Sequence, residues 1–128
     1  MSLLIPISVG ELLDKISILE IKSREIHDEA KKENINRELA ALQVIRHREI
    51  TGSPELDALY VQLQEVNQRL WNIEDEIRLK EREQIYDKFF IELARNVYFN
   101  NDLRAQLKRR INDISGSEFT EEKSYVDV

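Results

Sequence analysis

Two apolar stripes with the spacing of helices that pack on other helices run through this chain. The first stripe comprises Leu12, Ile16, Leu19, Ser23, Ile26 and Ala30, and the second comprises Leu56, Leu59, Leu63, Val66, Leu70, Ile73 and Ile77. Each stripe advances in alternating steps of four and three residues, which is typical of a narrow seam between two helices. The pattern predicts an all-α fold built around a long, coiled-coil-like helical hairpin.

The residues that favour turns place one bend between the two stripes. Ser8 begins a capping box that Glu11 completes, so a helix should start at the next residue. Thr51-Gly52-Ser53-Pro54 can end that helix and cap another. We therefore expect a first helix over residues 9–50, a second over residues 55–99, and an antiparallel arrangement of the two.

Weaker turn signals divide the remainder of the chain. Asn34 favours either a bend in the first helix or a division into two helices, because Asn is a weak helix former and a good cap. Asn100-Asn101-Asp102 predicts a turn before a short third helix over residues 102–115. Residues 1–8 are expected to form an N-terminal arm and residues 116–128 an extended tail. The prediction is one helical domain over residues 1–128.

The hairpin has a predicted register. A bend centred after Gly52 would set residues opposite each other when their numbers sum to about 105, so Leu42 would face Leu63. Residues 22–25 would face residues 81–84, and both stretches are polar. This polar layer is open to three interpretations: solvated ion pairs, a device that fixes the helix register, or a covered pocket for an anionic ligand. The candidate ligand-binding cations are Lys15, Lys22, Arg24 and Arg82.

Aromatic residues gather in the second half of the predicted second helix. They indicate either a buried cluster or a partner surface, because aromatic side chains are favoured at contact hot spots. The candidate interface residues are Trp71, Tyr86, Phe89, Phe90, Tyr98 and Phe99. An elongated chain of 128 residues buries little surface alone, so we expect a homo-oligomer, either a dimer or a tetramer, with a second protein as a further candidate partner.

Composition argues against several classes of function. The net charge of −6 disfavours binding along a nucleic-acid backbone. A local exception is a group of four cations near the C-terminus, Arg104, Lys108, Arg109 and Arg110. The acidic residues of the tail could neutralise its run Lys108-Arg109-Arg110, or that run could hold a phosphate. The chain has no cysteine and only two histidines, which are far apart, so we expect no metal site and no cofactor. No apolar stretch or leader suggests a membrane, and we expect a cytoplasmic protein.

The two ends of the chain resemble those of a bacterial and viral family of about this length, a domain of unknown function. The similar segments are residues 8–16 (SVGELLDKI) and 18–22 (ILEIK), residues 109–112 (RRIN), Gly116-Ser117, and residues 121–125 (EEKSY). Members sometimes accompany surface-polysaccharide and glycosyltransferase genes, so the resemblance implies an accessory role in sugar-polymer assembly and no catalytic residues. The first-helix pattern is also distantly similar to all-helical chorismate mutases, from which no catalytic role is transferred.

Together these features predict a non-enzymatic, oligomeric interaction or scaffold module. The alternative is a small all-helical enzyme or binding protein for an anionic metabolite, like the chorismate mutases or the all-helical nucleotide pyrophosphohydrolases. The latter hold magnesium with carboxylates three residues apart, a spacing that Glu11 and Asp14 share. No catalytic residue can be named from the sequence.

Overall fold

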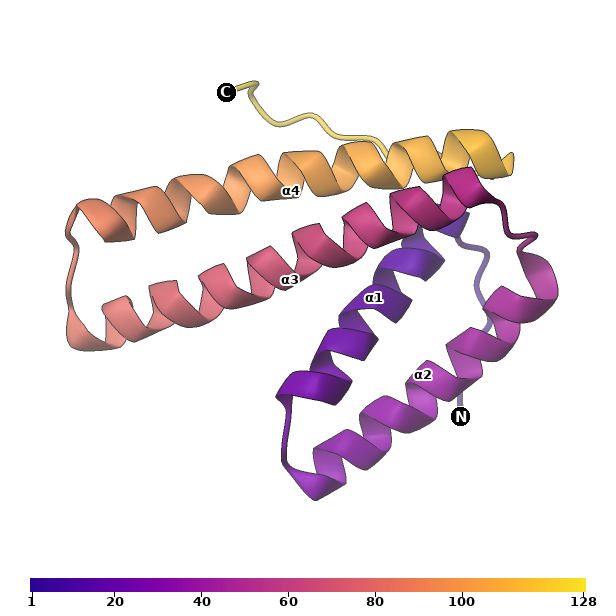
Figure 1. Ribbon diagram of the computed structural model, residues 1–128, viewed down its shortest axis with the longest axis horizontal. Coiled ribbons are helices and arrows are strands. Elements are labelled where there is room, and N and C mark those ends of the chain that lie inside the picture. Colours follow the sequence, from indigo (N-terminus) through magenta and orange to yellow (C-terminus); the bar gives the residue numbers. More distant parts are fainter.

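The computed structural model describes residues 1–128 and contains helices only, which confirms the all-α prediction. The four helices are α1 (Val9–Glu25), α2 (Glu29–Glu49), α3 (Pro54–Glu83) and α4 (Lys88–Ser115). Helices α3 and α4 run side by side, and α1 lies between α2 and that pair (Figure 1). Two helical hairpins, α1–α2 and α3–α4, therefore diverge from a shared end.

Three helix boundaries occur where the sequence places capping residues. The Ser8 hydroxyl accepts a hydrogen bond from the Glu11 amide at 3.0 Å, and α1 begins after it. The Ser53 hydroxyl accepts one from the Leu56 amide at 3.1 Å at the start of α3. Gly116 follows α4 with a φ of 63°, a left-handed conformation that glycine adopts without steric cost.

The predicted single helix over residues 9–50 is wrong, and the alternative of two helices is right, because α1 and α2 are separate. The chain is extended at Asp28, whose carboxylate accepts a hydrogen bond from the Lys31 amide at 2.9 Å and caps α2. The division therefore lies before Asn34, which is inside α2. The Ser23 hydroxyl donates to the Asn36 side chain at 2.9 Å, so α2 folds back along α1. The first apolar stripe crosses this turn without losing its phase, which is why periodicity did not reveal it.

The predicted second helix over residues 55–99 is also wrong, because α3 ends at Glu83 and α4 begins at Lys88. Gln84 ends α3 with a φ of 56°, and the Asp87 carboxylate accepts from the Phe90 amide at 3.0 Å. The short third helix over residues 102–115 is the last part of α4. The main hairpin of the molecule is therefore α3–α4, and its bend lies at residues 84–87.

The predicted register between residues 9–50 and 55–99 fails with the helix assignment. No α-carbon of α2 lies within 8 Å of one in α3, so Leu42 does not face Leu63 across a two-helix seam. Arg24 donates to Gln68 at 3.0 Å and is not opposite residues 81–84. The shorter α1 occupies the space that the prediction gave to a continuous hairpin.

The hydrophobic core lies where α1 crosses the α3–α4 pair. Its buried members are Leu12, Leu13, Ile16, Leu56, Leu59, Tyr60, Leu63, Val66, Leu107 and Ile111. Helix α2 has no fully buried residue and covers this core with half-buried aliphatic side chains such as Leu42 and Ile45. The other end of the α3–α4 pair extends past α1 and α2 (Figure 1). We call residues 79–99 the two-helix end, and none of them is fully buried.

Candidate functional site

Buried polar side chains gather beside the core, where α1 meets α3 and α4. Asp14 of α1 is 1% exposed, and its carboxylate accepts hydrogen bonds from Asn67 at 3.0 Å and from Arg104 Nε and Nη2 at 2.9 and 2.5 Å. Asn67 also donates to the Ser17 hydroxyl at 3.1 Å. A bidentate pair of this kind satisfies a charge that would be costly to bury alone. We call Asp14, Ser17, Asn67, Arg104 and Lys108 the polar centre.

Lys108 lies one helical turn after Arg104 and is also buried. Its ammonium is 2.9 Å from Glu11 Oε2 of α1 and 3.2 Å from Glu121 Oε2 in the C-terminal segment, residues 117–128. Burial disfavours the charged ammonium, but the hydrogen bond to Glu11 and the charges of Asp14 and Glu121 outweigh it, so the pKa of Lys108 is raised. The hydrogen bonds to Asp14 raise the pKa of Arg104 against a smaller opposing effect of burial. Both cations therefore stay charged.

A close approach of backbones fixes this geometry. The Gly10 amide donates to the Asn112 side chain at 2.7 Å, which ties the start of α1 to the end of α4. A β-carbon on Gly10 would lie 2.6 Å from the Lys108 carbonyl oxygen, so only glycine allows this approach. The contact sets Glu11 beside Lys108 and, one turn later, Asp14 beside Arg104.

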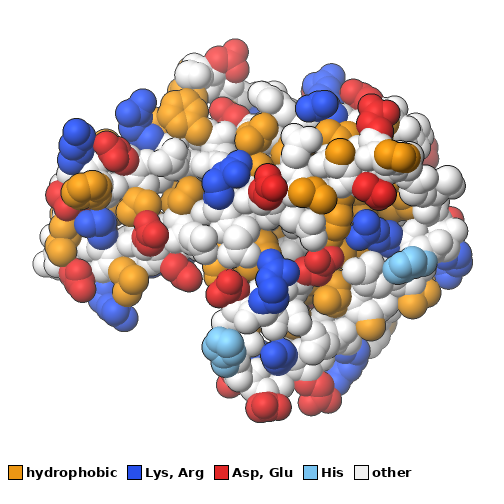
Figure 2. Space-filling view, in the orientation of Figure 1, with side chains coloured by type: hydrophobic (Ala, Val, Ile, Leu, Met, Phe, Trp, Pro, Cys, Tyr) orange, Lys and Arg blue, Asp and Glu red, His pale blue; other side chains and the backbone are white.

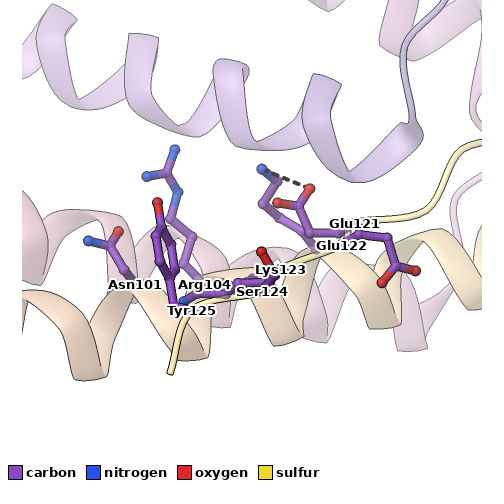
Figure 3. Close-up of a pocket in the computed structure, with 9 residues that line it drawn as sticks. Asn101, Arg104, Glu121, Glu122, Lys123, Ser124 and Tyr125 are labelled. Atoms are coloured by element: carbon purple, nitrogen blue, oxygen red, sulfur yellow. Dashed lines mark ion pairs between the residues drawn. The ribbon is translucent and has the colours of Figure 1, made fainter. Parts of the chain in front are cut away.

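Two cavities flank Arg104, and both are lined by Arg104 and Asn101. The first, about 550 Å³, lies between α4 and residues 121–125, and Figure 3 shows the side chains of this cavity with Tyr125 beside Arg104. The second, about 480 Å³, lies in the angle between α1 and the α3–α4 pair, where Figure 2 shows the surface hollowed. Its apolar lining is Ile18, Ile21, Leu70 and Trp71. A guanidinium with a fixed orientation thus stands between a charged cavity and a partly apolar one.

The structure does not bring the four predicted ligand-binding cations together. Lys15 is exposed on α1, and Lys22 and Arg24 belong to the last turn of the same helix. Arg82 is in the last turn of α3, about 21 Å along the helix from the position of Gln68, the partner of Arg24. None of the four lines either cavity beside Arg104.

The predicted interface residues fall into two groups. Five of them are on the two-helix end, where Figure 2 shows exposed hydrophobic side chains. Phe89 is 65% exposed and Tyr86 57%, while Phe90 is half-buried against the edge of the Tyr86 ring at 5.2 Å between ring centres. Tyr98 and Phe99 are also exposed. Trp71 is half-buried and lines the second cavity, which none of the other five lines.

The sequence indicates parts of the polar centre but not the whole. Glu11 and Asp14 have the spacing of a metal-binding pair of carboxylates, and Arg104 and Lys108 belong to a local group of cations. The two groups meet only because α1 crosses α4, which no local pattern indicates. The C-terminal segment does neutralise part of the basic run, since Lys108 pairs with Glu121 and Arg109 with Glu122 at 3.7 Å.

The structure also bears on metals and membranes. It contains no group of three or more histidine, aspartate or glutamate side chains placed to hold a metal ion. None of its helices has the length and apolar character needed to cross a bilayer. Comparisons with protein-family models, with curated proteins and with solved structures returned no match, so the site has to be interpreted from its own chemistry.

Proposed function

We propose that this chain is a helical interaction module that self-associates through its two-helix end. The observation that carries the proposal is the amount of exposed surface. The chain exposes 9088 Å², whereas a compact monomer of 15.2 kDa would expose about 7,100 Å². The N-terminal arm and the C-terminal segment account for part of this excess of about 2,000 Å². A standard protein–protein interface buries about 800 Å² of each partner, which is less than half of this excess.

The two-helix end concentrates apolar surface that the protomer leaves uncovered. Eight large side chains on or near it are more than a third exposed: Leu79, Ile85, Tyr86, Phe89, Ile91, Tyr98, Phe99 and Leu103. Soluble monomers rarely expose large contiguous apolar patches. Two helices without a further layer also leave the outer face of each helix unpacked, which is an arrangement that a partner stabilises.

Charge favours a second copy of the chain as that partner. The whole chain carries −6, which opposes self-association, but residues 79–99 contain four Lys or Arg and four Asp or Glu and are neutral. Two such ends related by a two-fold axis would form a four-helix bundle, the usual solution for paired helical hairpins. The mixed charges would then pair between copies at the rim of the contact.

We assign such a module an accessory role beside enzymes of sugar-polymer assembly. The support for this role is the resemblance of the chain's two ends to a family whose members sometimes accompany surface-polysaccharide genes. The alternative of an enzyme that binds an anion with Lys15, Lys22, Arg24 and Arg82 has less support, because none of these side chains lines either cavity beside Arg104. A scaffold needs a contact surface and no reacting group, and the two-helix end provides that surface.

Sedimentation velocity tests the proposal with exposed-residue variants that leave the core untouched. Phe89→Ser and Ile91→Ser remove apolar side chains from two different sides of α4, and Val44→Ser removes an equally exposed one from α2 as a matched control. The wild type and Val44→Ser should sediment as a dimer or tetramer, and at least one α4 variant should dissociate at the same concentration. All three should keep the helical circular dichroism of the wild type. Equal sedimentation of wild type and both α4 variants would refute the proposed contact.

A further inference from the structure

The C-terminal segment, residues 117–128, is tied at its start to α1, where the Ser117 hydroxyl accepts from the Val9 amide at 3.2 Å, and beyond Ser117 it lies on α4 through charged contacts. Glu121 pairs with Lys108, Glu122 with Arg109, and Lys123 with Asp102. The apolar side chains at its end are largely free, since Tyr125 is 82% exposed and Val126 is 88% exposed. Partly exposed ion pairs hold a segment weakly, and little apolar surface adds to them here. The segment can therefore leave α4 without unfolding the helices.

Glu121 is the only acidic side chain of this segment that reaches the polar centre. Its carboxylate is 3.2 Å from the Lys108 ammonium, and its charge also acts on Arg104. The carboxylate thus sits where an external anion would be attracted by both cations. Glu11 and Asp14, which also pair with these cations, belong to α1 and are fixed in the fold.

Both cations keep hydrogen-bonding capacity for an anion. Lys108 has three N–H donors and Glu11 takes one of them, which leaves two for Glu121 or its replacement. Arg104 gives Nε and Nη2 to Asp14, so its plane is fixed while Nη1 makes no hydrogen bond within the chain. An oriented guanidinium one turn from an ammonium is an arrangement suited to a phosphoryl group.

We propose that Arg104 and Lys108 form a binding site for a small phosphate monoester, and that Glu121 occupies the anion position until the ligand displaces it. The ligand must compete with Glu121 for Lys108, and this competition determines the charge that it needs. Glu121 is tethered, so its effective concentration at Lys108 is high, and a free monoanion would compete poorly. A phosphate monoester carries nearly two negative charges at neutral pH, so the two cations attract it more strongly than they attract a single carboxylate.

The second cavity indicates what the phosphoryl group should be attached to. It opens on the other side of Arg104, and its lining includes the half-buried Trp71 ring with Ile18, Ile21 and Leu70. Asn101 lines both cavities and can hydrogen-bond a ligand group that lies in either of them. A phosphate ester with a flat or ring-shaped body therefore fits the pair of cavities. This proposal is independent of self-association through the two-helix end.

Phenyl phosphate is the probe for the test, and Trp71 is the reporter because it is the only tryptophan. The full-length wild type and Glu121→Gln should both change tryptophan fluorescence with phenyl phosphate, and Glu121→Gln should bind at least about fivefold more tightly. Phenol and inorganic sulfate should produce much weaker responses. Trypsin should cleave after Lys123 faster when phenyl phosphate is present, because the segment leaves α4.

Arg109→Gln is the matched control, since it removes the neighbouring cation, which is exposed and pairs with Glu122 rather than Glu121. It should bind at least as tightly as the wild type, because the Arg109–Glu122 pair only helps to hold the segment, whereas Lys108→Met should lose binding. Glu121→Gln lies outside the core, so its comparison with wild type decides the question even if Lys108→Met does not fold. Equal affinity of Glu121→Gln and wild type, an equal loss in Arg109→Gln and Lys108→Met, or no binding to any variant would overturn the proposal.

Discussion

The close contact between Gly10 and α4 predicts that replacing Gly10 with alanine lowers the free energy of unfolding. In Gly10→Ala the new β-carbon would lie 2.6 Å from the Lys108 carbonyl oxygen and 2.9 Å from Asn112 Oδ1. The nearer atom belongs to the helix backbone and cannot rotate away, so α1 must move. Overpacking of this kind costs about 1–3 kcal/mol. Weakening the 2.7 Å hydrogen bond from the Gly10 amide to Asn112 adds about 1 kcal/mol.

The matched control is Gly52→Ala, because a β-carbon at Gly52 meets nothing within 4 Å and its φ is not left-handed. We expect Gly10→Ala to lose about 2–3 kcal/mol of unfolding free energy, after a small gain from the helix propensity of alanine. The melting temperature should fall by roughly 6–15 °C. Gly52→Ala should unfold within about 0.5 kcal/mol of the wild type. Urea unfolding followed by circular dichroism, at one protein concentration, measures both.

A loss of less than about 0.5 kcal/mol in Gly10→Ala would refute this account of the α1–α4 contact. It would mean that α1 does not approach α4 closely enough for its first turn to be restricted to glycine. In that case the contact at Gly10 would not be what places Glu11 and Asp14 beside α4.

Three further predictions concern other parts of the fold. Asp14→Asn should cost about 2–4 kcal/mol in urea unfolding, because it leaves the guanidinium of Arg104 without its charged partner. Burial and the hydrogen bond to Glu20 raise the pKa of Tyr60 above its ordinary value, so the folded state keeps a proton that the unfolded state loses. Stability should fall as pH rises past about 10, and fall less in Tyr60→Phe, as urea midpoints at about pH 9 and 11 would show. Asp28→Ala should lose about 1 kcal/mol, whereas Asp28→Asn, which still caps α2, should unfold like the wild type.

Local signals in the sequence are sufficient to predict helix boundaries where the capping residues bond only to neighbouring backbone groups. The Ser8 and Ser53 caps and Gly116 mark helix boundaries, because each acts on backbone groups within a few residues. The turn at residues 84–87 contains no glycine or proline, and its only N-cap residue, Asp87, is of a type that is common elsewhere in this acidic chain. Gln84 adopts a left-handed φ of 56° there, which is uncommon for a residue with a side chain.

The expected turn at Asn100-Asn101-Asp102 failed for the opposite reason. These residues favour turns when their side chains bond to the local backbone, but here Asn100 and Asp102 also bond to residues distant in the sequence, and Asn101 lines the two cavities. Asn100 accepts from Arg69 at 3.0 Å and donates to the Asn96 carbonyl, and Asp102 pairs with Lys123. Helix α4 therefore continues through all three.

The polar centre could not have been predicted from the sequence because its members come from three helices that cross. Asp14 and Arg104 are 90 residues apart, and Asp14 and Asn67 are 53 apart. Periodicity relates residues within one helix and says nothing about the angle between helices. The exposed aromatic residues were easier to find, because their enrichment in residues 86–99 is a local feature of the sequence.

The molar mass of the wild-type protein in solution tests the central proposal most directly. Light scattering during size-exclusion chromatography should give a multiple of 15.2 kDa across the micromolar range, with dissociation only on strong dilution. A mass of 15.2 kDa at every concentration would contradict self-association and leave the apolar side chains of the two-helix end without the partner that we assign to them.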